Sequence, residues 1–254
     1  AGDHAVSVVA QVPADRWDSP ALGTWTVRTL VGHLGRSFTT VVEYSARPAD
    51  RVEIADAPDY YLAIAGLLAD PGQTDARAAQ AGLALGDDPL GAVRELQERA
   101  TAALATDDHV IQTIAGGMRL SDYLPTRIFE LGLHSIDLAR AIGVAEAVPP
   151  EVADSIAALA VEVAKRRGDS QALMCALTGR GSLSLSRSRR SAARDRRRWI
   201  DGDVHPARDR SSRWRAVYRS YLKAQARPRH QEINHADKTR QAGVQKRGGL
   251  DWVR

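Results

Sequence analysis

Two polar residues four positions apart, Glu130 and His134, are the strongest candidates for chemistry in this chain of 254 residues. On a helix this spacing places both side chains on one face, one turn apart. A carboxylate oxygen and an imidazole nitrogen so placed can bind the same divalent cation. One more ligand from another helix would give three protein ligands and leave a position open, as in catalytic zinc centres.

His33 is the candidate for the third ligand. It lies three residues after Leu30, at the flank of an apolar pattern with helical spacing. If that helix packs against the helix that carries Glu130 and His134, the imidazole of His33 can complete a His–Glu–His set. The alternative is a partly buried histidine that binds no ligand, and His33 taken by itself favours that alternative.

The polar face around Glu130 and His134 also has a second interpretation. Arg127 and Asp137 lie on the same stripe of an otherwise apolar helix. Such a stripe is most often the solvated face of a helix, and spacing alone favours this interpretation over a metal site. The other histidines of the central and C-terminal regions are given no role: His109, His205, His230 and His235.

Apolar residues that recur every three or four positions predict the helices that must hold these side chains. Thr24 or Thr26 can cap the helix that contains His33. Ser121 and Asp122 can cap the helix of Glu130 and His134, and Gly143 ends it. The expected helical ranges are 5–12, 25–41, 58–70, 89–105, 121–142, 151–166 and 170–177.

One short segment departs from this helical pattern. Between residues 108 and 120, apolar residues around Val110 and Ile111 precede Gly116 and Gly117, which predicts an extended segment and turn or a small hairpin. Several helices with modest loops and little strand predict an all-α fold, an up-and-down bundle.

The charge distribution divides the chain near residue 183. Residues 1–183 contain 15 Lys and Arg against 24 Asp and Glu, a net charge of −9, whereas residues 184–254 contain 20 against 7, a net charge of +13. The second part has no apolar period, so we expect a mostly disordered basic tail with a short helix around 212–224. Such a tail can bind nucleic acid electrostatically. A solvated tail without function, or a sequence read in a shifted frame, is favoured over nucleic-acid binding.

Two further features limit the classes of protein to which the chain can belong. The single cysteine, Cys175, excludes a disulfide within the chain, and its apolar helical surroundings favour a buried hydrophobic residue over a nucleophile. The apolar runs are too short to span a bilayer and no leader pattern opens the chain, so we expect a cytoplasmic protein with no membrane partner.

Two long motifs resemble one known family. Residues 23–34, Gly-Thr-Trp-Thr-Val-Arg-Thr-Leu-Val-Gly-His-Leu, resemble the "W-[ST]-V-R-x-L-x-x-H-L" opening of the mycothiol-dependent maleylpyruvate isomerase family, in its N-terminal metal-binding domain. Residues 123–143 are similar to its second signature, "R-x-x-E-x-x-x-H-x-x-D-L-A". Residues 176–180 resemble the "L-T-G-R" that closes the domain.

The resemblance implies a DinB-like four-helix bundle over residues 1–183 that binds one divalent metal, usually zinc. It maps the metal ligands onto His33, Glu130 and His134. Asp137 matches the H-x-x-D of the family and is a candidate to orient His134, with a surface or capping carboxylate as the equal alternative.

The resemblance also implies a chemistry. The thiol mycothiol would be the cofactor, and its metal-activated thiolate would attack an electrophilic small molecule in an isomerase or a thiol transferase. The isomerases of the family carry a further folded domain, which residues 184–254 do not resemble. A metal-binding bundle without catalysis, acting as a sensor or interaction module, is the alternative from another functional class.

Overall fold

The computed structural model describes residues 1–67, 71–105 and 107–180 of the chain. The expected helix 212–224 and the predicted domain boundary at 183 lie outside these residues. The elements, in chain order, are α1 (Gly2–Val9), α2 (Val27–Ser45), α3 (Ala57–Leu67), α4 (Pro71–Ala84), α5 (Pro89–Ala103), β1 (Val110–Thr113), β2 (Gly116–Arg119), α6 (Leu120–Ile142), α7 (Pro150–Arg167) and α8 (Ser170–Leu177).

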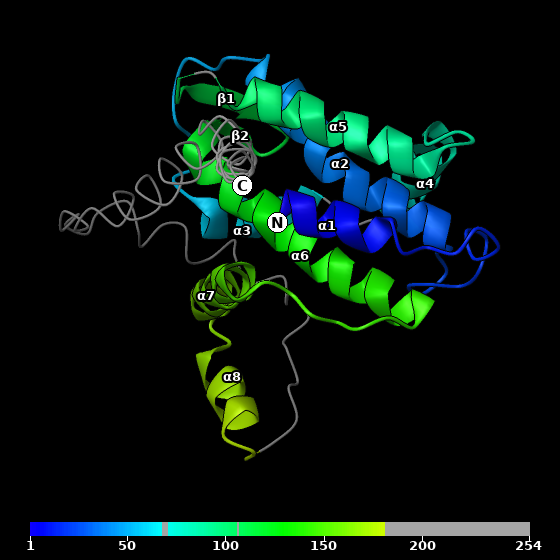
Figure 1. The fold of residues 1–254 in the computed structure, drawn as a ribbon. Helices are drawn as coiled ribbons and strands as arrows, with labels where there is room; N and C mark the ends of the chain where they lie inside the picture. The colour runs from blue at the N-terminus through cyan, green and yellow to red at the C-terminus, as the bar shows by residue number, and fades with distance from the viewer. Residues whose placement is uncertain (68–70, 106, 181–254) are drawn as a thin grey trace, which may run out of the picture. The chain divides into compact units, whose positions relative to one another are not determined.

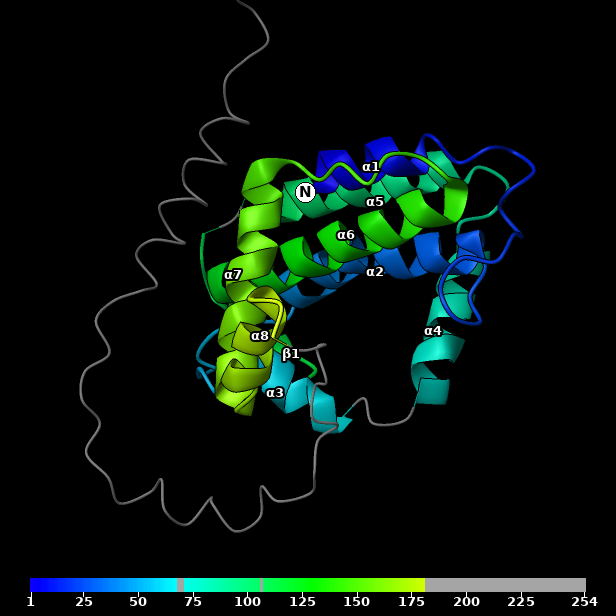
Figure 2. The ribbon, with the colours of Figure 1, turned by 90° about the horizontal axis from the view of Figure 1, so that it is seen from below.

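Four helices, α1, α2, α5 and α6, lie side by side and form a closed bundle (Figures 1 and 2). Around the bundle, α1 contacts α5 and α6, and α2 contacts the same two helices on the other side. Outside the bundle, α4 packs on α2, α7 crosses α6, and α3 contacts both α6 and α7. The all-α bundle expected from the helical periodicity is therefore confirmed.

The apolar stripes predicted from the sequence form the core of this bundle. On α2, the stripe of Leu30, Val31 and Leu34 is fully buried. On α6, Tyr123 and Leu138 are equally buried, and the hydroxyl of Tyr123 donates a hydrogen bond to Thr40 Oγ1 at 2.9 Å. Burial of these apolar side chains stabilises the contact between α2 and α6, the two helices with the candidate ligands.

The two helix starts are capped in different ways. Thr26 caps α2 as expected, because its side chain accepts a hydrogen bond from the backbone N–H of Thr29. The expected capping of α6 by Ser121 and Asp122 is wrong. Asp108, from the preceding loop, instead accepts hydrogen bonds from the backbone N–H and the hydroxyl of Ser121. Gly143 ends α6 in the left-handed conformation, as expected.

The predicted hairpin is confirmed between α5 and α6. Strands β1 and β2 pair antiparallel, with Val110 opposite Arg119 and Thr113 opposite Gly116. Gly116 has a φ of +127°, which favours glycine in this turn. The hairpin leads directly into α6, since β2 ends at Arg119 and α6 begins at the next residue.

One helix was not predicted. α4 is rich in alanine and glycine and lacks a stripe of large apolar residues. It packs on α2 through close backbone contact: a Cβ added at Gly32 would lie 2.2 Å from the backbone nitrogen of Gly82. This contact fixes α4 next to the turn of α2 that carries His33.

Two smaller expectations concern the burial of Cys175 and membrane-spanning segments. Cys175 lies on α8, as the apolar run predicted, but it is half-buried and not buried, because α8 is a short helix that packs on α7 without fully burying any of its own residues. Among the described helices, none combines the length and the apolar character needed to cross a bilayer.

Candidate metal centre

The structure brings together the three residues that the sequence singled out. His33 comes from α2, and Glu130 and His134 come from successive turns of α6. Each side chain offers one nitrogen or oxygen atom, and these three atoms lie within 4.8 Å of one another. We call His33, Glu130 and His134 the triad. A group of this composition and spacing can hold a divalent metal ion.

The triad lies in a half-buried position between helices and not on a solvated face. The side chains of His134 and Glu130 are 15% and 24% exposed. The ring centroids of His33 and His134 are 4.8 Å apart and the rings are nearly perpendicular. His134 Nε2 and Glu130 Oε2 are 3.4 Å apart. The solvated-stripe interpretation of this face of α6 is therefore wrong.

Hydrogen bonds fix the two candidate ligands on α6, Glu130 and His134, on the sides that face away from the triad. Asp137 Oδ2 lies 3.1 Å from His134 Nδ1, which leaves Nε2 to face Glu130 and His33. The hydroxyl of Tyr61, on α3, donates to Glu130 Oε1 at 2.7 Å. Each contact occupies the outer atom of a candidate ligand and directs the other atom into the triad.

The imidazole of His33 has an unsatisfied nitrogen. Its Nδ1 is buried and has no hydrogen-bond partner among the described residues. The indole of Trp25 covers the ring, with centroids 4.8 Å apart, and donates its own N–H to Asp75 on α4. A buried, unpaired nitrogen costs free energy. The ring that carries it packs against His134, and one of its nitrogens lies within 4.8 Å of the ligand atoms of Glu130 and His134, which fits a site for a cation.

The charges around the triad distribute protons unequally. Burial, followed by the charge of His134, lowers the pKa of His33 to about 4. Burial alone would raise the pKa of Glu130, but its contact with His134, the charge of Arg127 and the hydrogen bond from Tyr61 lower it to about 2. Burial would lower the pKa of His134, but Asp137 and Glu130 raise it to about 9. A pKa of about 9 favours a protonated His134 at neutral pH, so a cation that bound there would have to displace that proton.

Two arginines bring positive charge to the same region. Arg127 lies one turn before Glu130 on α6, and Arg36 lies one turn after His33 on α2. Arg127 is half-buried as a residue, and its guanidinium lies 4.7 Å from the ring centroid of Tyr123 and donates to Thr126 Oγ1. Neither arginine forms an ion pair with a described residue within 4.0 Å.

Sequence reasoning missed the roles of Tyr61 and Trp25. Tyr61 is 69 residues away from Glu130 in sequence, and no local spacing connects the two. Trp25 belongs to the first motif, together with His33, and this shared motif was the available signal that the two rings lie close together. His109 forms contacts with the backbone carbonyls of Asp107 and Ser45, away from the triad. His205, His230 and His235 lie outside the described residues.

The sequence profile of the mycothiol maleylpyruvate isomerase N-terminal domain matches residues 1–139, more than half of the chain. The chain belongs to this family. The matched region contains the whole triad and Asp137, and the DinB-like all-α fold that the resemblance implied is confirmed. Comparison with curated proteins and with solved structures finds no significant match. Family membership and the triad together indicate a metal-binding function related to mycothiol.

Proposed function

We propose that this protein is a zinc-dependent enzyme that uses mycothiol to attack an electrophilic small molecule, with His33, Glu130 and His134 as the metal ligands. The observation that carries the proposal is the triad itself, with two nitrogens and one oxygen from two helices converging within 4.8 Å. Imidazole and carboxylate ligands in this number suit zinc and leave one position for a further ligand.

The bound cation would stabilise the thiolate form of mycothiol, which is the nucleophile, near neutral pH. The thiol comes from outside the chain, because the single cysteine, Cys175, lies on α8 and is not part of the triad. Both isomerisation by reversible addition and transfer of the thiol to an electrophile require this same nucleophile.

The residues of the chain then have distinct roles. Asp137 and Tyr61 orient His134 and Glu130, so that the atoms facing the cation are fixed before it binds. Trp25 shields the ring of His33 from water. Arg127 and Arg36 make the surroundings positive, which favours a bound thiolate or another anionic reactant over a cationic one.

Metal analysis of the purified full-length chain tests the site, with His134→Ala as the variant and His4→Ala as the matched control on α1. We expect about one zinc per chain in the parent and in the control, and strong loss in His134→Ala. Equal zinc in all three proteins would overturn the assignment of the ligands.

Titration of the cobalt-substituted protein with mycothiol tests the thiol. We expect a sulfur-to-cobalt charge-transfer band that appears with mycothiol and does not appear with S-methylated mycothiol. Cys175→Ala should give the same band, since the sulfur comes from the cofactor. An unchanged spectrum of the cobalt protein on addition of mycothiol would contradict the proposed enzymatic function. It would favour a non-catalytic metal-binding module.

A further inference from the structure

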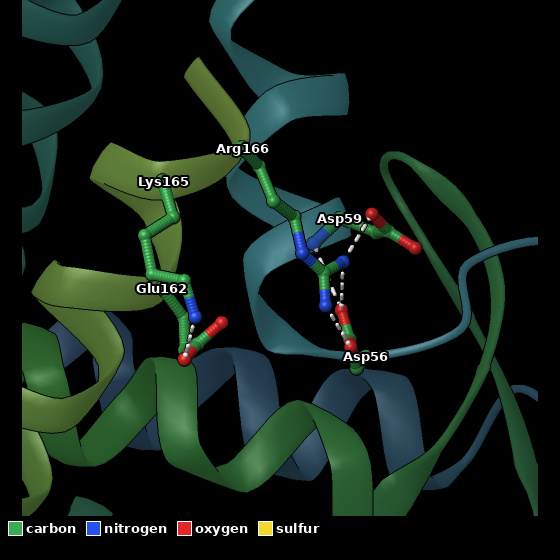
Figure 3. Close-up of polar contacts among 5 residues, drawn as sticks. All are labelled: Asp56, Asp59, Glu162, Lys165 and Arg166. Atoms are coloured by element: carbon green, nitrogen blue, oxygen red, sulfur yellow. Dashed lines mark hydrogen bonds and ion pairs between the residues drawn. The ribbon is translucent and has the colours of Figure 1, made fainter. Parts of the chain in front are cut away.

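A group of ion pairs connects the end of α7 to the start of α3 (Figure 3). Arg166 donates from Nη1 to Asp56 Oδ1 at 2.8 Å and from Nη2 to Asp56 Oδ2 at 2.6 Å, which is a bidentate pair. The same Nη1 also donates to Asp59. We call Arg166, Asp56 and Asp59 the α3–α7 network.

The location of the α3–α7 network at two helix ends strengthens it. Arg166 lies in the last turn of α7, where the helix dipole favours a positive charge, and Asp59 lies in the first turn of α3, where it favours a negative charge. Asp56 immediately precedes α3, and its Oδ1 also accepts a hydrogen bond from the backbone N–H of Asp59, as an N-cap does. The network therefore fixes where α3 begins.

The next turn of α3 reaches the triad. Tyr60 is buried and its ring packs against Tyr123 of α6 at a centroid distance of 5.5 Å. Tyr61 follows directly and donates its hydroxyl to Glu130 Oε1. Tyr61, whose hydroxyl holds a candidate metal ligand, therefore lies only two positions after Asp59, whose carboxylate is held by Arg166.

We propose that Arg166 is a positioning residue for the metal centre, acting through α3 and Tyr61 on the carboxylate of Glu130. The inference rests on the proposed function, because it takes Glu130 as a metal ligand. It extends the site beyond residues 1–139, the region that the family profile matches, to the end of α7. The hydrogen bonds of Arg166 go to Asp56 and Asp59 and not to the triad.

Cobalt affinity and the visible spectrum of bound cobalt, both measured on the full-length chain, test the inference without an activity assay. Tyr61→Phe removes the hydroxyl that holds Glu130, and we expect about tenfold weaker binding and altered absorption bands. Arg166→Ala acts on Glu130 only indirectly, through α3 and Tyr61. We therefore expect cobalt affinity to fall about three- to tenfold with a shift of the same absorption bands. Arg166→Lys keeps the charge without the bidentate geometry and should fall between the parent and Arg166→Ala.

Lys165→Ala is the matched control. Lys165 is the neighbour of Arg166 on α7, and it pairs with Glu162 of the same helix at 2.9 Å without reaching α3 (Figure 3). Its substitution removes a cation from the same turn but leaves the α3–α7 network intact. Cobalt affinity and spectrum should therefore remain those of the parent.

The decisive comparison repeats Arg166→Ala in the Tyr61→Phe background. If Arg166 acts through the Tyr61 hydroxyl, the second substitution should change cobalt affinity less than about twofold there. An equal effect in both backgrounds, or a lower melting temperature with unchanged affinity and spectrum, would overturn the inference and leave Arg166 a purely structural residue. A parent chain that binds no cobalt would instead overturn the proposed function, and the inference with it.

Discussion

The triad and the α3–α7 network are both polar clusters that join distant segments, but their internal pairing differs. In the α3–α7 network, both carboxylates receive hydrogen bonds from the Arg166 guanidinium. In the triad, two imidazoles and a carboxylate converge on one space, and a buried nitrogen of His33 has no described partner. A cluster in which the guanidinium is hydrogen-bonded to both carboxylates stabilises the contact between helices, whereas a cluster with an unpaired buried nitrogen can take a ligand.

The two clusters should therefore respond differently to metal and to salt. The stability that the triad gives should depend strongly on bound metal and weakly on ionic strength, because its side chains are half-buried. The α3–α7 network should depend on ionic strength, because its side chains are 33 to 40% exposed and salt screens exposed pairs.

The largest effect is expected from removal of a ligand. If His33 is a direct ligand, as proposed, His33→Ala should weaken zinc binding more than about 100-fold, which is more than the usual effect of removing a residue that only orients a ligand. Competition with a chromophoric chelator measures this, and His4→Ala provides the control. Binding within tenfold of the parent would show that His33 is only a packed histidine.

The next effect concerns pH. His134, with its pKa raised to about 9, must lose a proton to bind the cation, whereas Glu130 and His33, with pKa values of about 2 and 4, are already deprotonated near neutrality. Zinc affinity should therefore rise about tenfold per unit between roughly pH 6 and pH 8 and level off near pH 9. Isothermal titration in buffers of different ionisation enthalpy should show about one proton released per zinc. A flat profile over this range would contradict the protonated state of His134.

A smaller effect is expected at Asp137. Asp137→Asn removes the negative charge at His134 Nδ1, so zinc affinity at high pH should fall about tenfold. The pKa of His134 should fall as well, so the affinity should level off at a lower pH than in the parent. Unchanged affinity and an unchanged profile would indicate a surface carboxylate with no part in the site.

The smallest effect is expected in the α3–α7 network. Asp59→Asn keeps the cap provided by Asp56 but removes one ion pair, and the free energy of unfolding of the zinc-free protein should fall by less than about 1 kcal/mol. Urea unfolding at low and high salt measures the change, which should shrink at high salt. A loss that is larger and independent of salt would show that this contact behaves like the less exposed triad.

The sequence by itself determined most of the helices and the shared face of Glu130 and His134 on one of them. The stripe of Leu30, Val31 and Leu34 predicted α2 because core-facing positions repeat with the helical period. The spacing of Glu130 and His134 predicted one shared face for the same reason. α4 was not predicted, because it packs through alanine and glycine backbone contact, which leaves no large apolar stripe in the sequence.

Only the tertiary structure decided which polar residues meet. Spacing within α2 left His33 open between ligand and core residue, and the crossing of α2 with α6 placed it against His134. Tyr61 lies 69 residues from Glu130, and Arg166 lies 110 residues from Asp56, so no local pattern could join either pair. Helical periodicity fixes the face on which a side chain lies, but the residue that it meets depends on how the helices pack, a property of the whole core.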